Sequence, residues 1–400
     1  MMLLLIALLA TPVNLTIPEG NWLSPEYSLV EEWSLNPLEY VSTMRVPLGC
    51  ITESEEGSEY SWDITLLDEN RVIRFEDNQQ VNQIEIDLNV CQQFDIDFSP
   101  SGNYLLLFDD RNADCLRINL DEMHTEHAVL LDNHVPGSTY LSITDTGSIV
   151  LSAGLLRRIF NAHFENIFEY SGGRNFNEYF THDNEGNHFF FTMTDKLIGV
   201  NGSGQEIWRS KIDADYEIDD LVHNFITDPF GRNVVVQRTS LLQLFSGDVG
   251  EAFYRESFER IVANPVFSPS GNFLAVETKT YDEMLNFTNG LRLYSINSSA
   301  NEVTESFHSI YTNRESPRFI PISVSENGIV FARLSFHGAK LYRLVLLDSS
   351  GNAVWISALF SSESRYFTSS CGGIAGMTHD GRGIWHFDGN HVHAYKLDRG

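Results

Sequence analysis

Short apolar runs alternate with turn segments along nearly the whole chain of 400 residues. After one such turn come Tyr104 to Asp109, Cys115 to Leu120 and His127 to Leu131, each bounded by polar or turn-forming residues. Runs of this length without a helical spacing of apolar positions are typical of β-strands. The pattern therefore predicts an all-β protein built from many short strands.

One turn pattern recurs seven times: an apolar residue, Ser or Thr in most copies, a short polar turn with Gly, and then an apolar run. The glycines of the seven copies are Gly102, Gly147, Gly186, Gly231, Gly271, Gly328 and Gly381. They lie 39 to 57 residues apart, close to the period of about 40 to 50 residues that is typical of propeller blades. Ser, Pro, Asp and Asn initiate tight turns, and Gly supplies a positive φ that a branched residue could not. We therefore expect each copy to be a hairpin within a four-stranded blade.

The repeats also predict the number of blades and the closure of the ring. Ahead of the first full copy, residues 61–67, 71–75 and 83–88 form three more strand-like runs. They predict one β-propeller of eight four-stranded blades over residues 26–400, or of seven if the first copy packs outside the ring. The last copy lacks a fourth strand of its own. A strand near Tyr27 to Trp33 is expected to complete it, because this pairing removes both exposed sheet edges.

Two copies carry a resemblance to known repeat proteins. Phe98-Ser-Pro-Ser-Gly-Asn-Tyr-Leu and Phe267-Ser-Pro-Ser-Gly-Asn-Phe-Leu resemble the blade signature of WD40-like and bacterial propellers. The segments that end in Trp208 and Trp355 are similar to the Gly-x-x-x-Trp ends of quinoprotein (PQQ)-like repeats. No copy has the Gly-His and Trp-Asp pairs of true WD40 repeats, and the adjacent cysteines expected of quinone-dependent dehydrogenases are absent. The resemblance implies a fold shared by many functions.

The charge balance limits the class of partner. The chain has 26 Lys and Arg against 55 Asp and Glu, a formal net charge of −29, and no concentrated run of basic residues. Nucleic acid is held by a basic patch, so it is not expected as a partner. A solvated acidic surface that keeps the protein monomeric is the simplest interpretation, and an acidic recognition face is the alternative.

The N-terminus predicts export. Residues 1–10 form an apolar run that ends at Ala10 and is followed by Thr11-Pro12, as in the apolar part of a signal peptide. The run is too short to span a membrane, which takes about 20 residues, and no later stretch is long enough. An extracytoplasmic protein, periplasmic or secreted, is therefore expected. The alternative interpretations of this run are an N-terminal strand or a start site placed slightly wrong.

Strong catalytic and cofactor motifs are absent, so no cofactor is expected. The segment His386-Phe-Asp-Gly-Asn-His391-Val-His393 places His386 opposite His391 or His393 across a hairpin. We favour ordinary hairpin residues over a metal site as the interpretation of these histidines. The acidic segment Asp213 to Asp220 does not have the spacing of a calcium loop, so a solvated connector is favoured.

The four cysteines form no metal-binding pattern. Cys91 and Cys115 fall on the first and third strands of the second predicted blade, where both could lie toward one face. A disulfide between them and two unpaired thiols remain equal alternatives, because the sequence does not show whether their Cα atoms lie within about 7 Å.

The leading functional hypothesis is an exported, non-enzymatic scaffold that binds a protein or another ligand. Its predicted face consists of the loops between second and third strands and the connections between blades, where recognition residues usually lie. The candidate residues are Asp68, Asp109, Asp110, Asp213 and Asp215, and such an acidic face favours a basic partner. The alternative is a quinone-dependent or hydrolytic enzyme with its site in the central channel.

Overall fold

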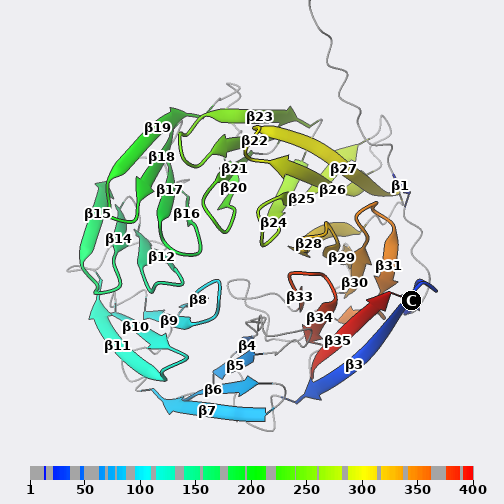
Figure 1. The fold of residues 1–400 in the computed structure, drawn as a ribbon, viewed down its shortest axis with the longest axis horizontal. Coiled ribbons are helices and arrows are strands. Elements are labelled where there is room, and N and C mark those ends of the chain that lie inside the picture. The colour runs from blue at the N-terminus through cyan, green and yellow to red at the C-terminus, as the bar shows by residue number, and fades with distance from the viewer. Residues whose placement is uncertain are drawn as a thin grey trace, which may run out of the picture.

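The fold was analysed in a computed structural model. It describes residues 13–14, 21–36, 46–48, 63–67, 71–76, 79–86, 95–109, 114–130, 139–153, 156–171, 179–193, 196–212, 222–238, 240–258, 261–281, 287–312, 317–336, 341–361, 375–387 and 391–399. Within these ranges the chain contains strands and turns and no helix. Eight sheets are arranged as a ring of blades around a central axis (Figure 1). The predicted all-β propeller of eight blades is confirmed, and the seven-blade alternative is wrong.

The blades follow one another in chain order. Blade 1 is β4 (Val46–Leu48), β5 (Asp63–Leu67), β6 (Arg71–Glu76) and β7 (Gln79–Glu85); blade 2 is β8 (Asp95–Phe98), β9 (Tyr104–Asp109), β10 (Asp114–Asn119) and β11 (His124–Val129). Blade 3 is β12 (Thr139–Ile143), β13 (Ile149–Ala153), β14 (Leu156–Phe160) and β15 (Asn166–Ser171); blade 4 is β16 (Phe180–His182), β17 (His188–Met193), β18 (Lys196–Asn201) and β19 (Glu206–Lys211).

The second half of the ring repeats this plan. Blade 5 is β20 (Val222–Thr227), β21 (Asn233–Arg238), β22 (Leu241–Ser246) and β23 (Ala252–Ser257); blade 6 is β24 (Ile261–Phe267), β25 (Phe273–Tyr281), β26 (Phe287–Asn297) and β27 (Glu302–Thr312). Blade 7 is β28 (Arg318–Val324), β29 (Val330–Phe336), β30 (Leu341–Leu347) and β31 (Ala353–Ile356), with β32 (Phe360–Ser361) also on β30. In blade 8, β33 (Ala375–Met377), β34 (Gly383–Phe387) and β35 (Val392–Arg399) pair in sequence.

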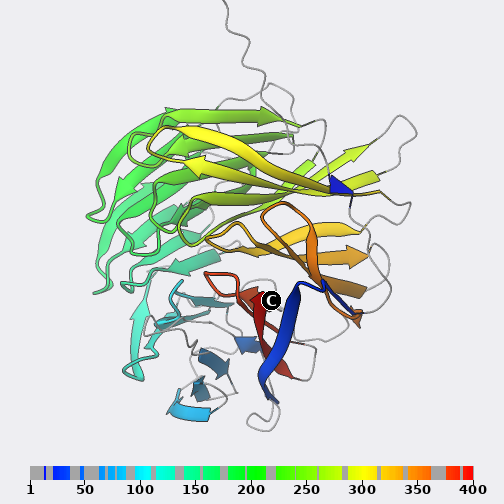
Figure 2. The same cartoon turned by 45° about the vertical axis from the view of Figure 1, so that its right-hand side comes forward.

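The ring closes by pairing the two ends of the chain. Strand β3 (Tyr27–Leu35) is antiparallel to β35 and forms the fourth strand of blade 8, with Tyr27 opposite Arg399 and Leu35 opposite Val392. The predicted closure is thus confirmed, and Figure 2 shows β3 and β35 side by side. Two shorter strands extend other blades: β1 (Val13–Asn14) pairs with β27, and β2 (Trp22–Leu23) pairs with β31.

The repeated turn joins the first and second strands of a blade. In all seven copies the predicted glycine has a φ between 70° and 80°, which confirms why Gly is needed there. Its N–H donates to the carbonyl three residues earlier, as from Gly102 to Ser99. The residue at that earlier position is a buried Ser, Thr or Asp whose side-chain oxygen accepts backbone N–H groups of the same turn, as Asp228 does from Phe230 and Arg232. This capping explains the Ser, Thr and Asp of the repeat.

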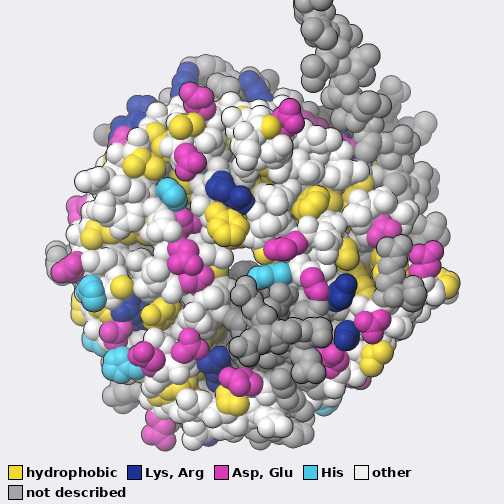
Figure 3. Space-filling view, in the orientation of Figure 1, with side chains coloured by type: hydrophobic (Ala, Val, Ile, Leu, Met, Phe, Trp, Pro, Cys, Tyr) yellow, Lys and Arg dark blue, Asp and Glu magenta, His cyan; other side chains and the backbone are white. Residues whose placement is uncertain are grey.

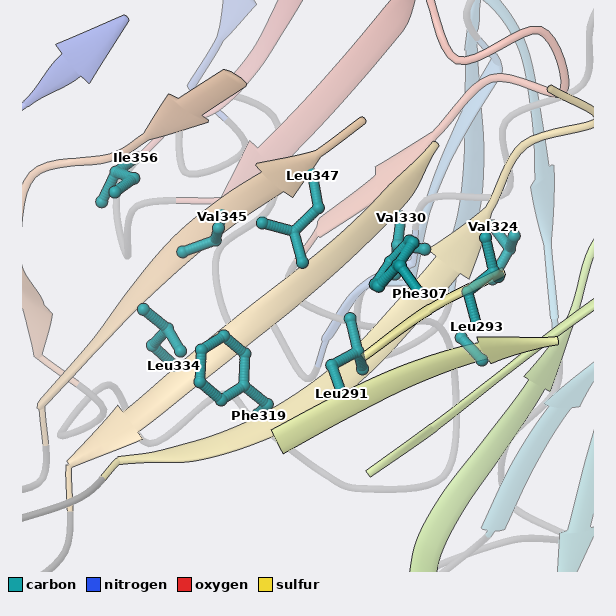
Figure 4. Close-up of a cluster of buried hydrophobic side chains, with 11 residues drawn as sticks. Leu291, Leu293, Phe307, Phe319, Val324, Val330, Leu334, Val345, Leu347 and Ile356 are labelled. Carbon is teal, nitrogen blue, oxygen red and sulfur yellow. The ribbon is translucent and has the colours of Figure 1, made fainter. Parts of the chain in front are cut away.

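Apolar side chains between neighbouring blades hold the ring together. Figure 4 shows the cluster between blades 6 and 7, in which Leu291 and Leu293 of β26 face Phe319 of β28 and Val330 of β29. These side chains are at most 2% exposed. Burial of a Leu, Val or Phe side chain contributes about 1.5–3 kcal/mol, so blade stacking is the main source of stability.

Candidate functional site at the channel mouth

The repeated turns of several blades meet at one end of the central axis and surround a hollow of about 370 Å³, the channel mouth. Its lining comes from five blades and consists of Asp145, Asn184, Glu185, Pro229, Phe230, Phe267, Pro269 and His379. Most of these residues occupy the same place in the repeat, directly after the buried capping residue of the turn. The fold therefore directs this one repeat position toward the axis.

Hydrogen bonds between turns of neighbouring blades fix the shape of the mouth. Ser101 donates from N and Oγ to Oδ1 of Asp145, at 2.7 and 2.6 Å. The N–H of Asp145 donates to the carbonyl of Asn184 (2.7 Å), and the N–H of Asn184 donates to the carbonyl of Pro229 (2.9 Å). These bonds link blades 2 to 5, so the mouth is a preformed site on a rigid scaffold.

An exposed aromatic ring lies in this mouth. Phe230 is 55% exposed although it belongs to a tight turn whose first residue, Asp228, caps the backbone N–H groups of the turn. The guanidinium of Arg232 lies 4.7 Å from the centre of its ring and also donates to the carbonyl of Ser270 in the next blade. The ring therefore already accepts one cation on its face, as aromatic rings do through their quadrupole.

The polar groups of the mouth give it an acidic rim. Asp145 is half-buried and Glu185 is exposed, while Pro229, Pro269 and Phe267 supply apolar surface. Figure 3 shows one face of the ring, with acidic side chains spread over it and several of them around the central opening. Carboxylates beside aromatic and proline surface form an environment that favours an ammonium or guanidinium group.

A second set of polar groups links the inner strands just before these turns. Nε2 of His182 lies 2.8 Å from Oγ of Ser142, and Nδ1 lies 2.7 Å from the carbonyl oxygen of Asp183. In blade 2, Oδ2 of Asp97 accepts the N–H of Ile143, the residue after Ser142 (3.1 Å). The bonds of Asp97 to Ile143 and of His182 to Ser142 thus link the inner strands of blades 2, 3 and 4.

Burial shifts Asp97 and His182 toward their neutral forms. Desolvation raises the pKa of Asp97 to about 6, although the hydrogen bond from the N–H of Ile143 opposes the shift. Desolvation also lowers the pKa of His182, against the attraction of Asp183 and Asp145. Near neutral pH the imidazole is therefore uncharged, and the proton on Asp97 is lost.

The predicted histidine cluster is partly confirmed in geometry. His386 of β34 pairs in register with His393 of β35, one of its two expected partners, and the ring centres are 5.1 Å apart. Nδ1 of His393 lies 2.7 Å from Oε1 of Glu31 on β3, so this contact also joins the closing strand to blade 8. Across the described part of the chain, no group of three His, Cys, Asp or Glu side chains is placed to hold a metal ion.

The acidic face predicted from the sequence stays a prediction. Asp109 is the last residue of β9, at the end of this strand opposite the repeated turn, and its side chain is not among those that the structure describes. Asp68, Asp110, Asp213 and Asp215 lie outside the described residues. Cys91 does too, while Cys115 is buried in β10, so their pairing also remains a prediction. Residues 1–10 lie outside as well, and among the described segments no helix is long and apolar enough to cross a membrane.

Sequence reasoning missed the channel mouth, although a signal was present. The turns were used only as markers of the repeat. In the fourth copy, Asp228-Pro-Phe-Gly231, a large aromatic residue stands where the other copies have Ser, Thr, Asn, Asp or Glu. A turn needs no aromatic residue at that position. Phe230 therefore departs from the repeat pattern in a way that indicates a recognition site.

Comparison with known proteins identifies the fold. No protein-family profile matches the chain, and no curated protein matches it in sequence. Among solved structures, the C-terminal WD40 domain of Sif2 superposes with a TM-score of 0.54 at 9% identity, over 88% of this chain and 97% of that one. The fold is that of a WD40-like β-propeller. At this identity the similarity extends to the fold alone.

Two further structures superpose less closely. Apo AztD from Citrobacter koseri has a TM-score of 0.49 at 10% identity, over 79% of this chain and 86% of that one. The β-propeller domain of Cps50 (Swd1) from Myceliophteria thermophila has a TM-score of 0.47 at 12% identity, over 76% and 95%.

Proposed function

We propose that this propeller is an exported, non-enzymatic scaffold that binds a basic segment of a protein partner at the channel mouth. The observation that carries the proposal is the 55% exposed Phe230 in a preformed hollow beside Asp145 and Glu185. Propellers present turns and loops on a rigid ring, and recognition residues usually lie on such segments. The net charge of −29 adds long-range attraction for a basic partner.

The chemistry of the mouth favours arginine or lysine side chains over other groups. Arg232 already packs on the Phe230 ring, so a guanidinium is a compatible neighbour for that ring. A second cation needs negative charge nearby, and Asp145 and Glu185 supply it from two blades. Asp145 keeps both Ser101 bonds to Oδ1, which fix the position of its carboxylate.

The acidic loops predicted from the sequence form a second proposed contact surface. Asp109 ends β9 on the side away from the mouth and Asp110 comes next in the sequence, while Asp213 and Asp215 come after β19 in the sequence. A partner that uses these loops would approach from the opposite side of the ring. The two surfaces are therefore separable by substitution.

Binding of an octa-arginine peptide, followed by fluorescence anisotropy, tests the proposal. Phe230→Ala should weaken binding roughly two- to fivefold, because a cation–π contact at an exposed site contributes about 0.5–1 kcal/mol. Glu185→Gln should weaken it less at physiological salt than at low salt, because screening already reduces the attraction of an exposed charge.

Matched controls separate the mouth from general acidity. Val249→Ala and Glu122→Gln alter an exposed apolar and an exposed acidic residue in turns that do not line the mouth, and should leave binding unchanged. The combined replacement of Asp109, Asp110, Asp213 and Asp215 by Asn tests the other surface. Loss of binding only in that variant would refute the mouth and support the loops; equal effects of all variants would refute both.

Export is tested by the mass of the native protein. If residues 1–10 are a signal peptide, the mature chain should begin after Ala10 or within several residues of it. Mass spectrometry of the N-terminal peptide from the source organism measures this directly. Retention of Met1 in a soluble, cytosolic protein would contradict export.

A further inference from the structure

A second hollow lies on the same face of the ring as the channel mouth, between the turns of blades 7 and 8. Its volume of about 780 Å³ falls within the range of about 300–1,000 Å³ that is typical of ligand sites. We call it the seam groove, because the two ends of the chain meet there. We propose that the basic partner segment continues from the mouth into the seam groove in extended form; this inference rests on the proposed function for its contact at the mouth.

The seam groove exists because of the way the ring closes. In blades 5 and 7 the turn between the third and fourth strands packs on the outer strand of the preceding blade, Gly250 against Trp208 of β19 and Gly351 against Phe307 of β27. Blade 8 takes its fourth strand, β3, from the other end of the chain, so no turn joins β35 to β3. The space beside blade 7 that such a turn would fill is the groove.

Backbone hydrogen bonds hold the walls of the groove in place. The connection from β2 to β3 crosses at the outer side, where the N–H of Ser24 donates to the carbonyl of Val354 (2.8 Å) and the N–H of Tyr27 donates to the carbonyl of Ser24 (3.0 Å). In blade 8 the N–H of Leu397 donates to the carbonyl of Arg382 (2.6 Å). All five residues line the groove, which is therefore a preformed site like the mouth.

One turn of blade 8 borders both hollows. His379 lines the mouth, and the next residue, Asp380, lines the groove. The N–H of Glu326 in blade 7 donates to the carbonyl of His379 (2.8 Å), and Nδ2 of Asn327 donates to the carbonyl of Asp380 (3.3 Å). An extended segment advances about 3.3 Å per residue, so a few residues are enough to pass this turn and to contact both hollows.

The groove has the charge that complements a basic segment. Its lining includes four carboxylates and one guanidinium, those of Glu26, Asp348, Asp380, Asp398 and Arg382. Glu26 and Asp398 are exposed, so a ligand can reach them from solvent. Oδ2 of Asp380 lies 3.7 Å from Nε of Arg382, so a guanidinium of the protein itself already pairs with a carboxylate there. Arginine and lysine side chains therefore fit this groove better than anionic or apolar ones.

Peptide length distinguishes this path from binding at the mouth alone. Two extended residues span about 7 Å, whereas eight span about 26 Å. Arg-Arg amide is therefore a probe for the mouth, and octa-arginine is a probe for the mouth and the groove together. Contacts in the groove are expected only for the longer peptide.

Neutralising the exposed carboxylates of the groove tests the path. The double variant Glu26→Gln, Asp398→Asn should weaken octa-arginine binding roughly three- to tenfold through the loss of two ion pairs, and should leave Arg-Arg amide binding nearly unchanged. Glu122→Gln with Asp248→Asn is the control: it removes the same charge from exposed turn residues of this face outside both hollows, and should change neither peptide's binding appreciably. Equal loss of octa-arginine binding in the two double variants would overturn the groove.

A steric variant leaves every charge in place. Ser349 is exposed on the groove wall, in the turn between β30 and β31. Ser349→Leu should obstruct the groove and weaken octa-arginine binding but not Arg-Arg amide binding. Ser203→Leu, in the corresponding turn of blade 4, should weaken neither. Unchanged octa-arginine binding in Ser349→Leu, or equal loss in the two leucine variants, would overturn the path.

Phe230→Ala separates the groove from the proposed function. It should weaken binding of both peptides, because both contact the mouth. If Phe230→Ala changes neither while the groove variants still weaken octa-arginine binding, the function at the mouth is refuted and the groove stands as a cation site of its own. If only Phe230→Ala has an effect, the groove is overturned and the mouth stands. Absence of octa-arginine binding by the parent would refute both.

Discussion

A chain that lacks residues 1–36 should fail to close the ring and should melt roughly 10 °C or more below the parent. These residues contain β3, the fourth strand of blade 8. Without β3 the backbone groups of β35 lose their partners along one edge, and such an edge pairs readily with other chains. We therefore also expect concentration-dependent aggregation.

Side-chain packing adds to this loss. Leu35 of β3 is only 2% exposed, and Leu29 packs in the cluster that contains Leu397 and Ile384. Removing a buried leucine alone costs about 2–5 kcal/mol, a large part of the net stability of a domain. The hydrogen bond of His393 with Glu31 is lost as well, but its partly exposed position makes it a minor contribution.

A shorter deletion is the matched control. Removal of residues 1–24 takes away β1 and β2 but keeps β3, so the melting temperature should fall much less. Adding a synthetic peptide of residues 25–36 to the longer deletion should restore part of the stability by pairing with β35. Thermal melts by circular dichroism measure both. If the two deletions melt alike, closure by β3 is not what stabilises the ring.

The architecture was predictable because it depends on local and repeated features. The seven glycines with positive φ, the capping Ser, Thr and Asp, and the apolar runs each act within one hairpin, so a single sequence reveals them. The closing strand followed from the missing fourth strand of the last copy. Strand limits were less exact: the last strand of blade 1 spans Gln79–Glu85, whereas the apolar pattern placed it at 83–88. This strand lies at the outside of the blade, where exposed polar residues weaken the pattern.

The site was not predictable, because it depends on residues brought together from distant repeats. Ser142 and His182 lie 40 residues apart, yet their side chains meet because inner strands of successive blades are neighbours. Asp145 and Phe230 become part of one hollow only when five turns converge on the axis. The sequence shows where these two residues stand in the repeat. That this repeat position faces the axis is a property of the closed ring.

Replacing Gly247 with alanine should destabilise the protein by about 3 kcal/mol, although only one methyl group is added. A Cβ at this position would lie 1.6 Å from the carbonyl oxygen of Gly231, in the repeated turn of the same blade. That oxygen belongs to backbone and cannot rotate away. The N–H of Gly247 also donates to the carbonyl of Arg232 (2.7 Å), so the turn cannot retreat without breaking this bond.

The equivalent glycine one blade earlier provides the control. A Cβ at Gly202 would lie 2.8 Å from the carbonyl oxygen of Gly186, a much milder backbone contact than the one at Gly247, so Gly202→Ala should cost less, about 1 kcal/mol. Urea unfolding of both variants measures the difference. Because the Gly231 turn carries Phe230, Gly247→Ala should also displace the ring and weaken octa-arginine binding, while Gly202→Ala changes binding less. Equal destabilisation by the two substitutions would show that the close contact at Gly247 does not set the position of the Phe230 turn.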